Sequence, residues 1–561
     1  MKKLLAILIT LAAATPLVAQ TKTRYLISIR RPVEMTGLRM LRDPEDFAAH
    51  AVRTFKTLPF VAADLTDAEV AALKKSADVN YVSAVVPRYI DGDPANVGAP
   101  KFVPVTDSRY SNAQTVWYGI DLVHARDVWP VTKGNRNAVN VAVVDTGIDY
   151  HHPELKDQYQ GGYNVFTQKN DPMDDHAHGT HVSGIITAAD NNFGVVGVAP
   201  EVHLWGVKVL QSTGQGTDES VIAGMDWVIN KKKEIGGNWI VNLSLGASAA
   251  SEAERQTFAR AIDAGILICA AAGNRATKTL DYPGAYDQVI AVSAIDDQSQ
   301  LADFSSYGPG VGFAAPGVGV LSTVIVGSAH DTAVVSGANT LRAWALTGSQ
   351  NGEVKGQTAF CGIGNPEDFP VDIKGKIAVI RRGTLTFHDK VQNAIKAGAA
   401  GVIIVPNDDR NDMPTWTLWP PVCDGITCSI SDDDKAYPWG VALAVNKADG
   451  DQLVADAGKN QTLASNTPDD YAILSGTSMA TPHVVGTAAL VWSLAPDATA
   501  QDIRLAMKLS ADDLGEKGYD IRFGYGRIDA LTAAKYIAPG LFGLPPTPPA
   551  TPTRRRPSSH H

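Results

Sequence analysis

Apolar runs alternate with helical segments from about residue 137 of this 561-residue chain, and no other feature limits its fold as strongly. Five of these runs are expected strands, at 139–144, 202–209, 239–243, 266–272 and 289–295. Helices are expected between them, for example at 220–233 and 252–264. Buried strands that alternate with helices predict an α/β fold in which helices cover both faces of a parallel sheet.

A different pattern interrupts this alternation after residue 323, and the earlier one resumes at about 471. The interruption contains an expected strand at 375–380, a helix at 389–397 and a strand at 401–405. We therefore expect an inserted domain at 330–468, which divides the main domain into residues 106–329 and 469–538.

The residues before the main domain form a small α+β unit at 20–105. Strands are expected at 25–29 and 80–85. Thr66 and Glu69 have the spacing of a capping box, which predicts a helix at 67–75. The stretch 90–111 is rich in Asp, Pro, Gly and Asn, which indicates an exposed linker.

The two ends of the chain differ from the domains between them. Residues 1–19 combine two lysines, a short apolar run and a small residue at the end, which predicts a secretory signal peptide. The alternative is a transmembrane anchor, but the run is short for a span. Residues 539–561 are Pro-rich with three consecutive arginines, so we expect a disordered tail; binding of acidic partners is the alternative.

The charge balance and the cysteines limit the partners and the compartment. Lys and Arg number 49 against 59 Asp and Glu, and the net charge of −10 disfavours a nucleic-acid partner. No later stretch is long enough for a membrane span, so the mature protein is expected to be secreted or periplasmic, without a membrane segment. Cys269 lies in an apolar strand and is expected to be a buried free thiol, whereas any two of Cys361, Cys423 and Cys428 can pair.

Three polar segments carry the residues with catalytic potential. Asp145 ends a buried strand, where α/β sheets place reacting groups. His176, His178 and His181 stand close together, which suggests a metal site, although the His-Glu-x-x-His arrangement is missing. Ser478 begins a helix that runs to residue 494, but the segment is not the Gly-x-Ser-x-Gly elbow, because Ala480 replaces the second glycine. In isolation each segment also fits a plain structural role.

Together, in the order Asp, His, Ser, these segments resemble the motifs of the subtilisin-like serine proteases, the subtilases. The resemblance covers about 110–325 and 470–535. It implies a subtilisin-like catalytic domain in which Ser478 forms an acyl-enzyme, His178 is the general base and Asp145 orients the imidazole. Asn274, in the segment 271–274, is implied as the side-chain donor to the oxyanion, together with the backbone amide of Ser478.

The same resemblance places the binding site for an extended polypeptide substrate. It implies one edge strand at Ser244, Leu245 and Gly246, an opposite edge at Gly214 and Gly216, and a side-chain pocket lined by Ala271 and Gly273. Asp281 lies near the base of this pocket, so we expect tolerance of Lys and Arg before the cut. An ion pair between Asp281 and Arg275 would cancel that effect and leave a broad apolar preference.

Further expectations follow from the resemblance. The unit at 20–105 resembles the inhibitory propeptide of these proteases, and the insertion resembles a protease-associated domain. The loop 190–195 resembles a calcium-binding loop, with Glu154 and Asn191 as side-chain ligands. Carbonyl ligands are implied at Ala189, Phe193 and Val195. Glu154 stands where the family usually has Asp, and a polar turn without an ion is the alternative.

The sequence thus predicts a secreted serine endopeptidase made as a zymogen, with its own propeptide as inhibitor and no cofactor in catalysis. Two other functions remain to be weighed. The first is an inactive subtilase-like protein that binds partners through its insertion. The second is a metallohydrolase built on His176, His178 and His181.

Overall fold

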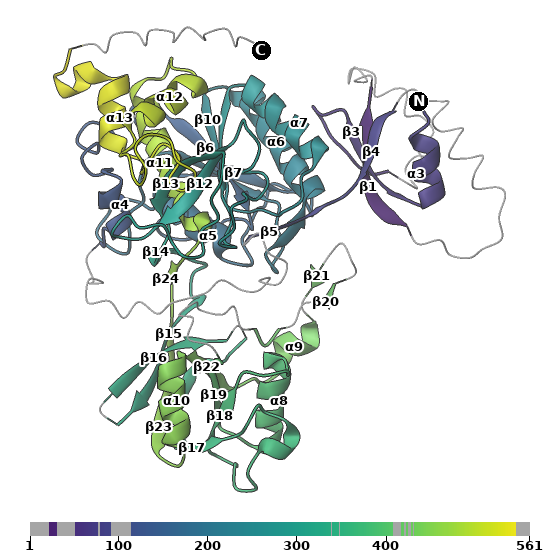
Figure 1. Cartoon of the computed structure of the whole chain (residues 1–561), viewed down its shortest axis with the longest axis vertical. Coiled ribbons are helices and arrows are strands. Elements are labelled where there is room, and N and C mark those ends of the chain that lie inside the picture. The colour runs from purple at the N-terminus through teal and green to yellow at the C-terminus, as the bar shows by residue number, and fades with distance from the viewer. Residues whose placement is uncertain are drawn as a thin grey trace, which may run out of the picture.

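The computed structural model describes residues 22–30, 51–76, 79–90, 114–337, 339–346, 348–407, 417–419, 422–423, 428–429 and 431–545. The predicted signal peptide and most of the predicted linker and tail lie outside these residues. The described chain forms three units (Figure 1): an N-terminal unit (22–90), a sheet unit (114–328 and 470–545) and an inserted barrel (329–469).

A seven-stranded sheet forms the centre of the sheet unit, and all its neighbouring strands are parallel. Its strands, in spatial order, are β13 (Val311–Pro316), β12 (Ile290–Ile295), β11 (Ile266–Ala271), β10 (Asn238–Leu243), β6 (Val139–Asp145), β8 (His203–Lys208) and β7 (Tyr159–Asn164). Because the strands are parallel, their carboxyl ends share one edge of the sheet, and the strand order reverses beside β6, where open α/β sheets place their sites.

Helices cover both faces of this sheet. On one face lie α5 (His178–Thr187) and α11 (Thr477–Leu494), and on the other lie α6 (Asp218–Ile235) and α7 (Glu252–Asp263). Successive residues of β6 enter the two cores alternately: Val141 and Val143 pack with α11, whereas Ala142 and Val144 pack with α6. The predicted parallel sheet with two covered faces is confirmed.

The N-terminal unit is an antiparallel sheet with one helix. The strand order is β2 (Ala51–Thr54), β3 (Phe60–Leu65), β1 (Thr23–Ile29) and β4 (Val79–Ala84). Helix α3 (Asp67–Leu73) begins at the predicted capping box, in which Thr66 and Glu69 each accept a backbone N–H of the other. A further strand, β5 (Pro87–Tyr89), leaves this sheet and pairs with β9 (Gln215–Thr217) of the sheet unit.

The insertion forms a closed barrel of seven strands. They are β15 (Ala329–Ser336), β16 (Asn339–Ala345), β22 (Val441–Val445), β19 (Gly401–Val405), β18 (Ile377–Arg381), β17 (Gly352–Phe360) and β23 (Asn460–Asp469). Helices α8 (Phe387–Ala397), α9 (Asp432–Ala436) and α10 (Lys447–Ala455) complete it, with the short pair β20 (Val422–Cys423) and β21 (Cys428–Ser429). Cys361 is a buried free thiol, as is Cys269 of the sheet unit, and the register places Cys423 opposite Cys428.

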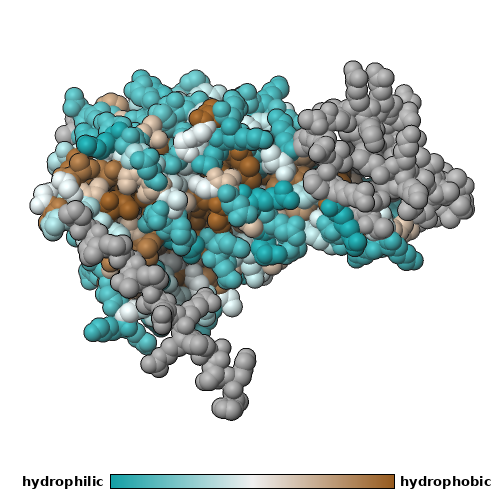
Figure 2. Space-filling view, turned by 90° about the horizontal axis from the view of Figure 1, so that it is seen from above, coloured by the Kyte–Doolittle hydropathy of each residue, from teal (hydrophilic) through white to brown (hydrophobic). Residues whose placement is uncertain are grey.

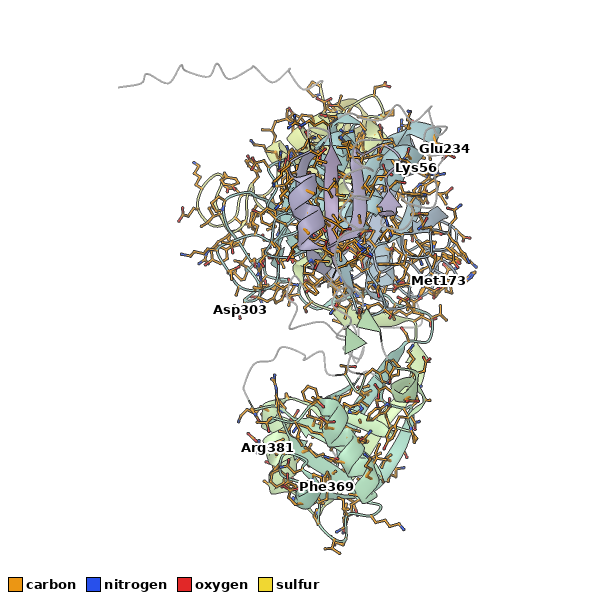
Figure 3. The ribbon with its side chains drawn as sticks, turned by 90° about the vertical axis from the view of Figure 1, so that its right-hand side faces the viewer. Lys56, Met173, Glu234, Asp303, Phe369 and Arg381 are labelled. Atoms are coloured by element: carbon orange, nitrogen blue, oxygen red, sulfur yellow. The ribbon has the colours of Figure 1, made fainter. Side chains whose placement is uncertain are left out.

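Two adjacent chain crossings join the barrel to the sheet unit. They continue from the antiparallel pair β14 (Val320–Thr323) and β24 (Tyr471–Leu474), and the Asp470 carbonyl accepts from Val324 N at 2.8 Å. Ala329 then pairs with Asp469 at the start of the barrel. In Figure 3 the labelled Phe369 and Arg381 lie on the barrel, apart from Met173 and Asp303 of the sheet unit.

The C-terminal part corrects one expectation. After α12 (Ala500–Ser510) and α13 (Ala530–Ile537), the segment Pro539–Phe542 forms the 3-10 helix η4, and Phe542 packs against the core. The tail predicted from residue 539 is therefore ordered at its start, because Phe542 finds apolar contacts.

No helix among the described residues is long and apolar enough to cross a membrane. Seen from above, much of the surface is hydrophilic, with apolar patches between (Figure 2).

Candidate active site

Asp145 and His178 meet at the carboxyl end of β6. His178 Nδ1 lies 2.8 Å from Asp145 Oδ1, and both side chains are buried. The same carboxylate oxygen accepts the backbone N–H of Thr146 at 2.7 Å, which fixes its direction. A carboxylate at Nδ1 favours the tautomer that carries its proton there, so that Nε2 can act as the base.

The first turn of α5 is held in place by Asp174, a residue that the sequence analysis did not single out. Its carboxylate accepts the backbone N–H groups of His176, Ala177 and Thr180 at 2.9–3.0 Å, as well as the Thr180 hydroxyl. Ala177, the residue before His178, has the left-handed φ of 82°. The turn therefore directs His178 back toward β6. In the sequence, the sign of this role for Asp174 is an acidic residue shortly before a helix whose N-cap residue, Ala177, has no capping side chain.

Ser478 lies in the first turn of α11, and its carbonyl has an unusual partner. Pro482, four residues later, has no N–H to donate to the Ser478 carbonyl. The Ser244 hydroxyl donates there instead, at 2.7 Å, and the Asn242 side-chain amide donates to Ser244 Oγ at 2.9 Å. The helix that carries Ser478 is thus fixed to the predicted substrate-binding strand by a side-chain hydrogen bond.

Asn274 is oriented by the residue that precedes Ser478. Its Oδ1 accepts both the backbone N–H and the hydroxyl of Thr477, each at 2.8 Å. This leaves Nδ2 as the group of the amide that can donate. Asn274 Nδ2 lies next to the start of α11, since a Cβ added to Gly476 would be 3.4 Å from it. The orientation of this side chain is therefore fixed by Thr477.

A strand of the N-terminal unit occupies the groove between the two predicted substrate edges. Tyr89 exchanges both backbone hydrogen bonds with Gly246, at 3.0 and 2.8 Å. On the other side Arg88 pairs with Gly216, and Ile90 N donates to the Gly214 carbonyl at 3.2 Å. Ser478 Oγ lies 3.1 Å from the Ile90 carbonyl oxygen and 3.1 Å from that of Ser244. β5 thus lies as an extended peptide between two edges and ends at the serine.

The predicted side-chain pocket contains an ion pair. Arg275 donates from Nη2 to Asp281 Oδ1, and Asp281 is fully buried. The Asp281 side chain lies against Gly273 of the predicted pocket and Gly246 of the predicted edge strand. A Cβ added to Gly273 would be 2.4 Å from Asp281 Oδ2, and a Cβ added to Gly246 would be 2.9 Å from the Asp281 Cβ. Ala271 is buried beside them, whereas Leu245 belongs to the core under the strand.

The predicted calcium ligands form two adjacent clusters. Three oxygens converge on the side-chain amide nitrogen of Gln114: those of the Ala189 carbonyl (2.6 Å), the Val195 carbonyl (3.2 Å) and the Asn191 amide (3.4 Å). On its other side, Gln114 Oε1 accepts the backbone N–H of Asn191 at 3.1 Å, so the amide would have to turn to present this oxygen to a cation. Gln114 was not identified from the sequence. Phe193 donates its N–H to Asn191 Oδ1 at 2.9 Å.

Glu154 belongs to the second cluster. Its carboxylate accepts from Asn191 Nδ2 (2.8 Å), Val195 N (3.1 Å) and the Tyr471 hydroxyl (3.0 Å). Burial raises the pKa of Glu154 to about 7. The carboxylate is therefore placed to orient Asn191, and its oxygens are not among those that meet at Gln114.

The other two histidines of the motif do not combine with His178 into a metal site. His181 Nε2 lies 3.0 and 3.1 Å from the carbonyls of Ala472 and Val320, and burial lowers the pKa of His181 to about 3. His176 lies near Gly214, at the wall of the groove. Among the residues with described positions, no three His, Cys, Asp or Glu side chains form a group that could hold a metal ion.

Comparisons with known proteins agree with this geometry. Residues 136–349 and 427–526 match the subtilase family, and residues 345–453 match the PA domain. The thermostable alkaline protease of Halalkalibacterium halodurans is 35% identical over 309 residues, which cover 54% of this chain and 75% of that protein. Subtilisin NAT of Bacillus subtilis subsp. natto is 32% identical over 312 residues (54% and 74%). Subtilisin DY of Bacillus licheniformis is 41% identical over 216 residues (38% and 76%). The chain belongs to the subtilase family of serine proteases and carries an inserted PA domain.

Proposed function

We propose that this serine endopeptidase is made as a zymogen, with the N-terminal unit as its inhibitory propeptide, and that it cleaves peptide bonds with Ser478, His178 and Asp145. The observation that carries the proposal is the position of β5. This strand pairs with both edges of the groove, and the carbonyl oxygen of Ile90, the residue after it, lies 3.1 Å from Ser478 Oγ. An extended peptide that occupies the groove in the way a substrate would prevents any other substrate from binding there.

The proposed reaction assigns a role to each of these residues. Ser478 Oγ attacks the carbonyl carbon as His178 Nε2 takes its proton, and Asp145 stabilises the imidazolium through Nδ1. The oxyanion receives hydrogen bonds from Asn274 Nδ2 and the Ser478 backbone amide. His178 then protonates the leaving amine, and water releases the acyl group by the reverse sequence.

The first cut is proposed at one of the two peptide bonds that flank Asp91. Ile90 contributes the carbonyl that lies 3.1 Å from Ser478 Oγ, so the first cut is expected at the bond after Ile90 or at the next bond along the chain. A chain that processes itself should yield a mature N-terminus at Asp91 or Gly92, measured by intact-mass spectrometry of the freshly activated enzyme. Trimming further into 91–113 can follow, so early time points are needed. A first product that begins elsewhere would contradict the assignment.

An active-site serine reagent tests the peptidase assignment separately. The processed enzyme should be labelled at Ser478 in a burst of one equivalent and lose its activity. Activity that survives full labelling would exclude the proposed nucleophile. An unlabelled, inactive protein would instead favour a chain that only binds its partners.

We further propose a structural calcium ion at the Ala189, Asn191 and Val195 oxygens, with Gln114 as an additional ligand. Hard oxygen ligands from one loop suit calcium, and the ion would supply the positive charge that the Gln114 amide now offers. Chelation should lower the melting temperature of Ser478→Ala protein, which cannot digest itself. Asn191→Ala should abolish that response, whereas Asn192→Ala, at the exposed neighbour, should keep it. A melting temperature unchanged by chelation would contradict the site.

Secretion is the remaining part of the proposal and rests on the composition of residues 1–19. Expression of the full chain with a mutated apolar run should retain the protein inside the producing cell. Export of that variant at the normal rate would contradict the signal.

A further inference from the structure

The side chain of Arg88 provides the strongest contact between β5 and the groove. Its Nε and Nη2 donate to Glu254 Oε1 and Oε2 at 3.0 and 2.6 Å, and both side chains have 0% exposure. Burial alone would lower the pKa of Arg88, but the charge and hydrogen bonds of Glu254, together with the charge of Asp218, outweigh burial and raise this pKa. A guanidinium that meets a carboxylate with two parallel hydrogen bonds is a specific arrangement and not a generic surface pair.

The pocket around this guanidinium is built by the sheet unit. Glu254 lies in the first turn of α7, and the hydroxyl of Tyr286 lies 3.0 Å from its Oε2. A second acid, Asp218, is the first residue of α6 and is also fully buried; its charge acts on Arg88 as well. Burial raises the pKa of Asp218 to about 6, and the charge of Arg88 opposes that rise. Asp218 Oδ1 accepts the backbone N–H of Val86 at 2.9 Å, and the charge of Asp218 adds to that of Glu254 at Arg88.

That cation leaves when the propeptide leaves. Glu254 and Asp218 remain in the mature enzyme, whereas Arg88 belongs to the segment that is cut away. A substrate strand in the place of β5 buries these carboxylates again, and burying them without a cation is costly, so the pocket favours a substrate that supplies one. The two β edges recognise only backbone, so a substrate strand can take the register of β5 and bring its own side chain to this point.

The pocket nearer the cut offers no such attraction. There the buried Asp281 is already paired with Arg275, a residue of the sheet unit that stays in the mature enzyme. A basic substrate side chain would have to compete with this internal partner. The acidic charge available to a substrate is therefore in the Glu254 pocket.

We propose that the mature enzyme has an arginine-selective subsite, formed by Glu254 and Asp218, for the substrate residue that takes the place of Arg88, two positions before that of Ile90. The inference rests on the proposed zymogen function, because it takes β5 as a stand-in for a substrate. The seated Arg88 side chain is the observation that identifies the ligand as a guanidinium in an extended peptide.

Internally quenched peptides with the sequence of residues 85–95 provide the test. One series places Arg, Lys, Leu, Ala or Glu at the position of Arg88, and kcat/KM is measured with processed enzyme. We expect Arg to exceed Leu by on the order of 10²-fold, as for a buried charge pair at an interface. Lys should fall between them, because it cannot form the two-pronged contact. Glu should be the poorest.

Variants of the pocket assign the selectivity to Glu254. Glu254→Leu should reverse the order of Arg and Leu, whereas Glu252→Gln, an exposed residue on the same helix, should leave the ratio as it is. Glu254→Leu also removes the partner of Arg88 and can hinder maturation. In the double variant Arg88→Leu/Glu254→Leu, an uncharged propeptide side chain meets an uncharged pocket, so maturation is restored. Its mature form has the same pocket as the mature Glu254→Leu enzyme.

The outcomes are distinguishable. Equal kcat/KM for the Arg, Leu and Ala peptides would overturn the subsite while leaving the peptidase proposal intact. Arg selectivity that persists in the mature double variant would mean that another part of the enzyme recognises the arginine, which would also overturn the subsite. Failure to cleave any peptide, without labelling of Ser478, would instead contradict the proposed function on which the inference rests.

Discussion

The N-terminal unit and the inserted barrel are both attached to the sheet unit, but through different kinds of contact. The N-terminal unit contributes charged side chains: the partly buried Arg24 and Arg53 both reach Glu219, and the fully buried Arg88 reaches Glu254. The barrel is joined through two backbone crossings, at Val324 beside Asp470 and at Ala329 beside Asp469. The first unit can therefore be released once its chain is cut, whereas the second is held by covalent connections at both ends.

This difference predicts that the two units respond differently to loss of the nucleophile, which has the largest expected effect. Ser478→Ala should lower kcat by about 10⁶, a magnitude known from subtilisin. The variant should keep its N-terminal unit attached, because no cut is made after β5, while the barrel stays folded. Gel analysis and circular dichroism check both points. Removal of the N-terminal unit in this variant, in a host without other proteases, would show that the cut is not its own.

A graded loss sharpens the same comparison. Asn274→Ala removes one donor to the oxyanion and should reduce kcat by about 10²–10³, again the loss known from subtilisin. Self-cleavage uses the same site, so the rate of propeptide cleavage should fall by a similar factor. Both rates are measured on one preparation. Slower turnover with normal processing would mean that the two reactions use different donors.

The charged contacts of the N-terminal unit should control how long it inhibits after cleavage. Asp226 accepts the backbone N–H groups of Lys56 and Thr57 at 2.7 and 2.8 Å, together with the Thr57 hydroxyl. Asp226→Ala should shorten the lag between cleavage and full activity by roughly 10- to 100-fold. Glu234→Ala is the matched control, because Glu234 is an exposed residue of the same helix that pairs with Lys231. An unchanged lag would show that this contact does not limit release.

Removal of the barrel should have the smallest effect. Ala329 and Asp469 are antiparallel neighbours, so a two-residue Asn-Gly turn can replace residues 330–468. The shortened enzyme should hydrolyse short peptides with kcat/KM within about threefold of the parent, because the barrel has its own core. A larger loss on proteins than on short peptides would indicate that the barrel contacts substrates. Failure of the shortened chain to fold would contradict the comparison itself.

Much of this architecture could be predicted from local sequence. The strands of the central sheet are short apolar runs, and the capping box at Thr66 and Glu69 fixes the start of α3. Asp145, His178, Ser478 and Asn274 could be chosen as the candidate site because each lies in a long motif. The structure brings the first two within 2.8 Å and seats Asn274 beside the start of α11.

Features set by distant pairing could not be predicted in the same way. β5 has three residues and no periodicity, and its position depends on edges more than 120 residues away, at Gly216 and Gly246. Gln114 and Asp174 carry no motif of their own, since their roles depend on loops that fold around them. The pairing of Asp281 with Arg275 was a stated alternative, and only the three-dimensional arrangement could favour it.

The insertion also has a consequence for the order of synthesis. Asp145 and His178 precede the barrel, whereas Ser478 follows it and lies 388 residues after Ile90. Because a chain is made from its N-terminus, β5 and both edges of the groove exist long before the nucleophile does. Under the proposed function, a nascent chain that is interrupted anywhere before α11 carries the blocking strand without the proposed nucleophile. On that proposal, proteolytic activity arises last in the synthesis of the polypeptide, when the strand proposed to block the groove is already present.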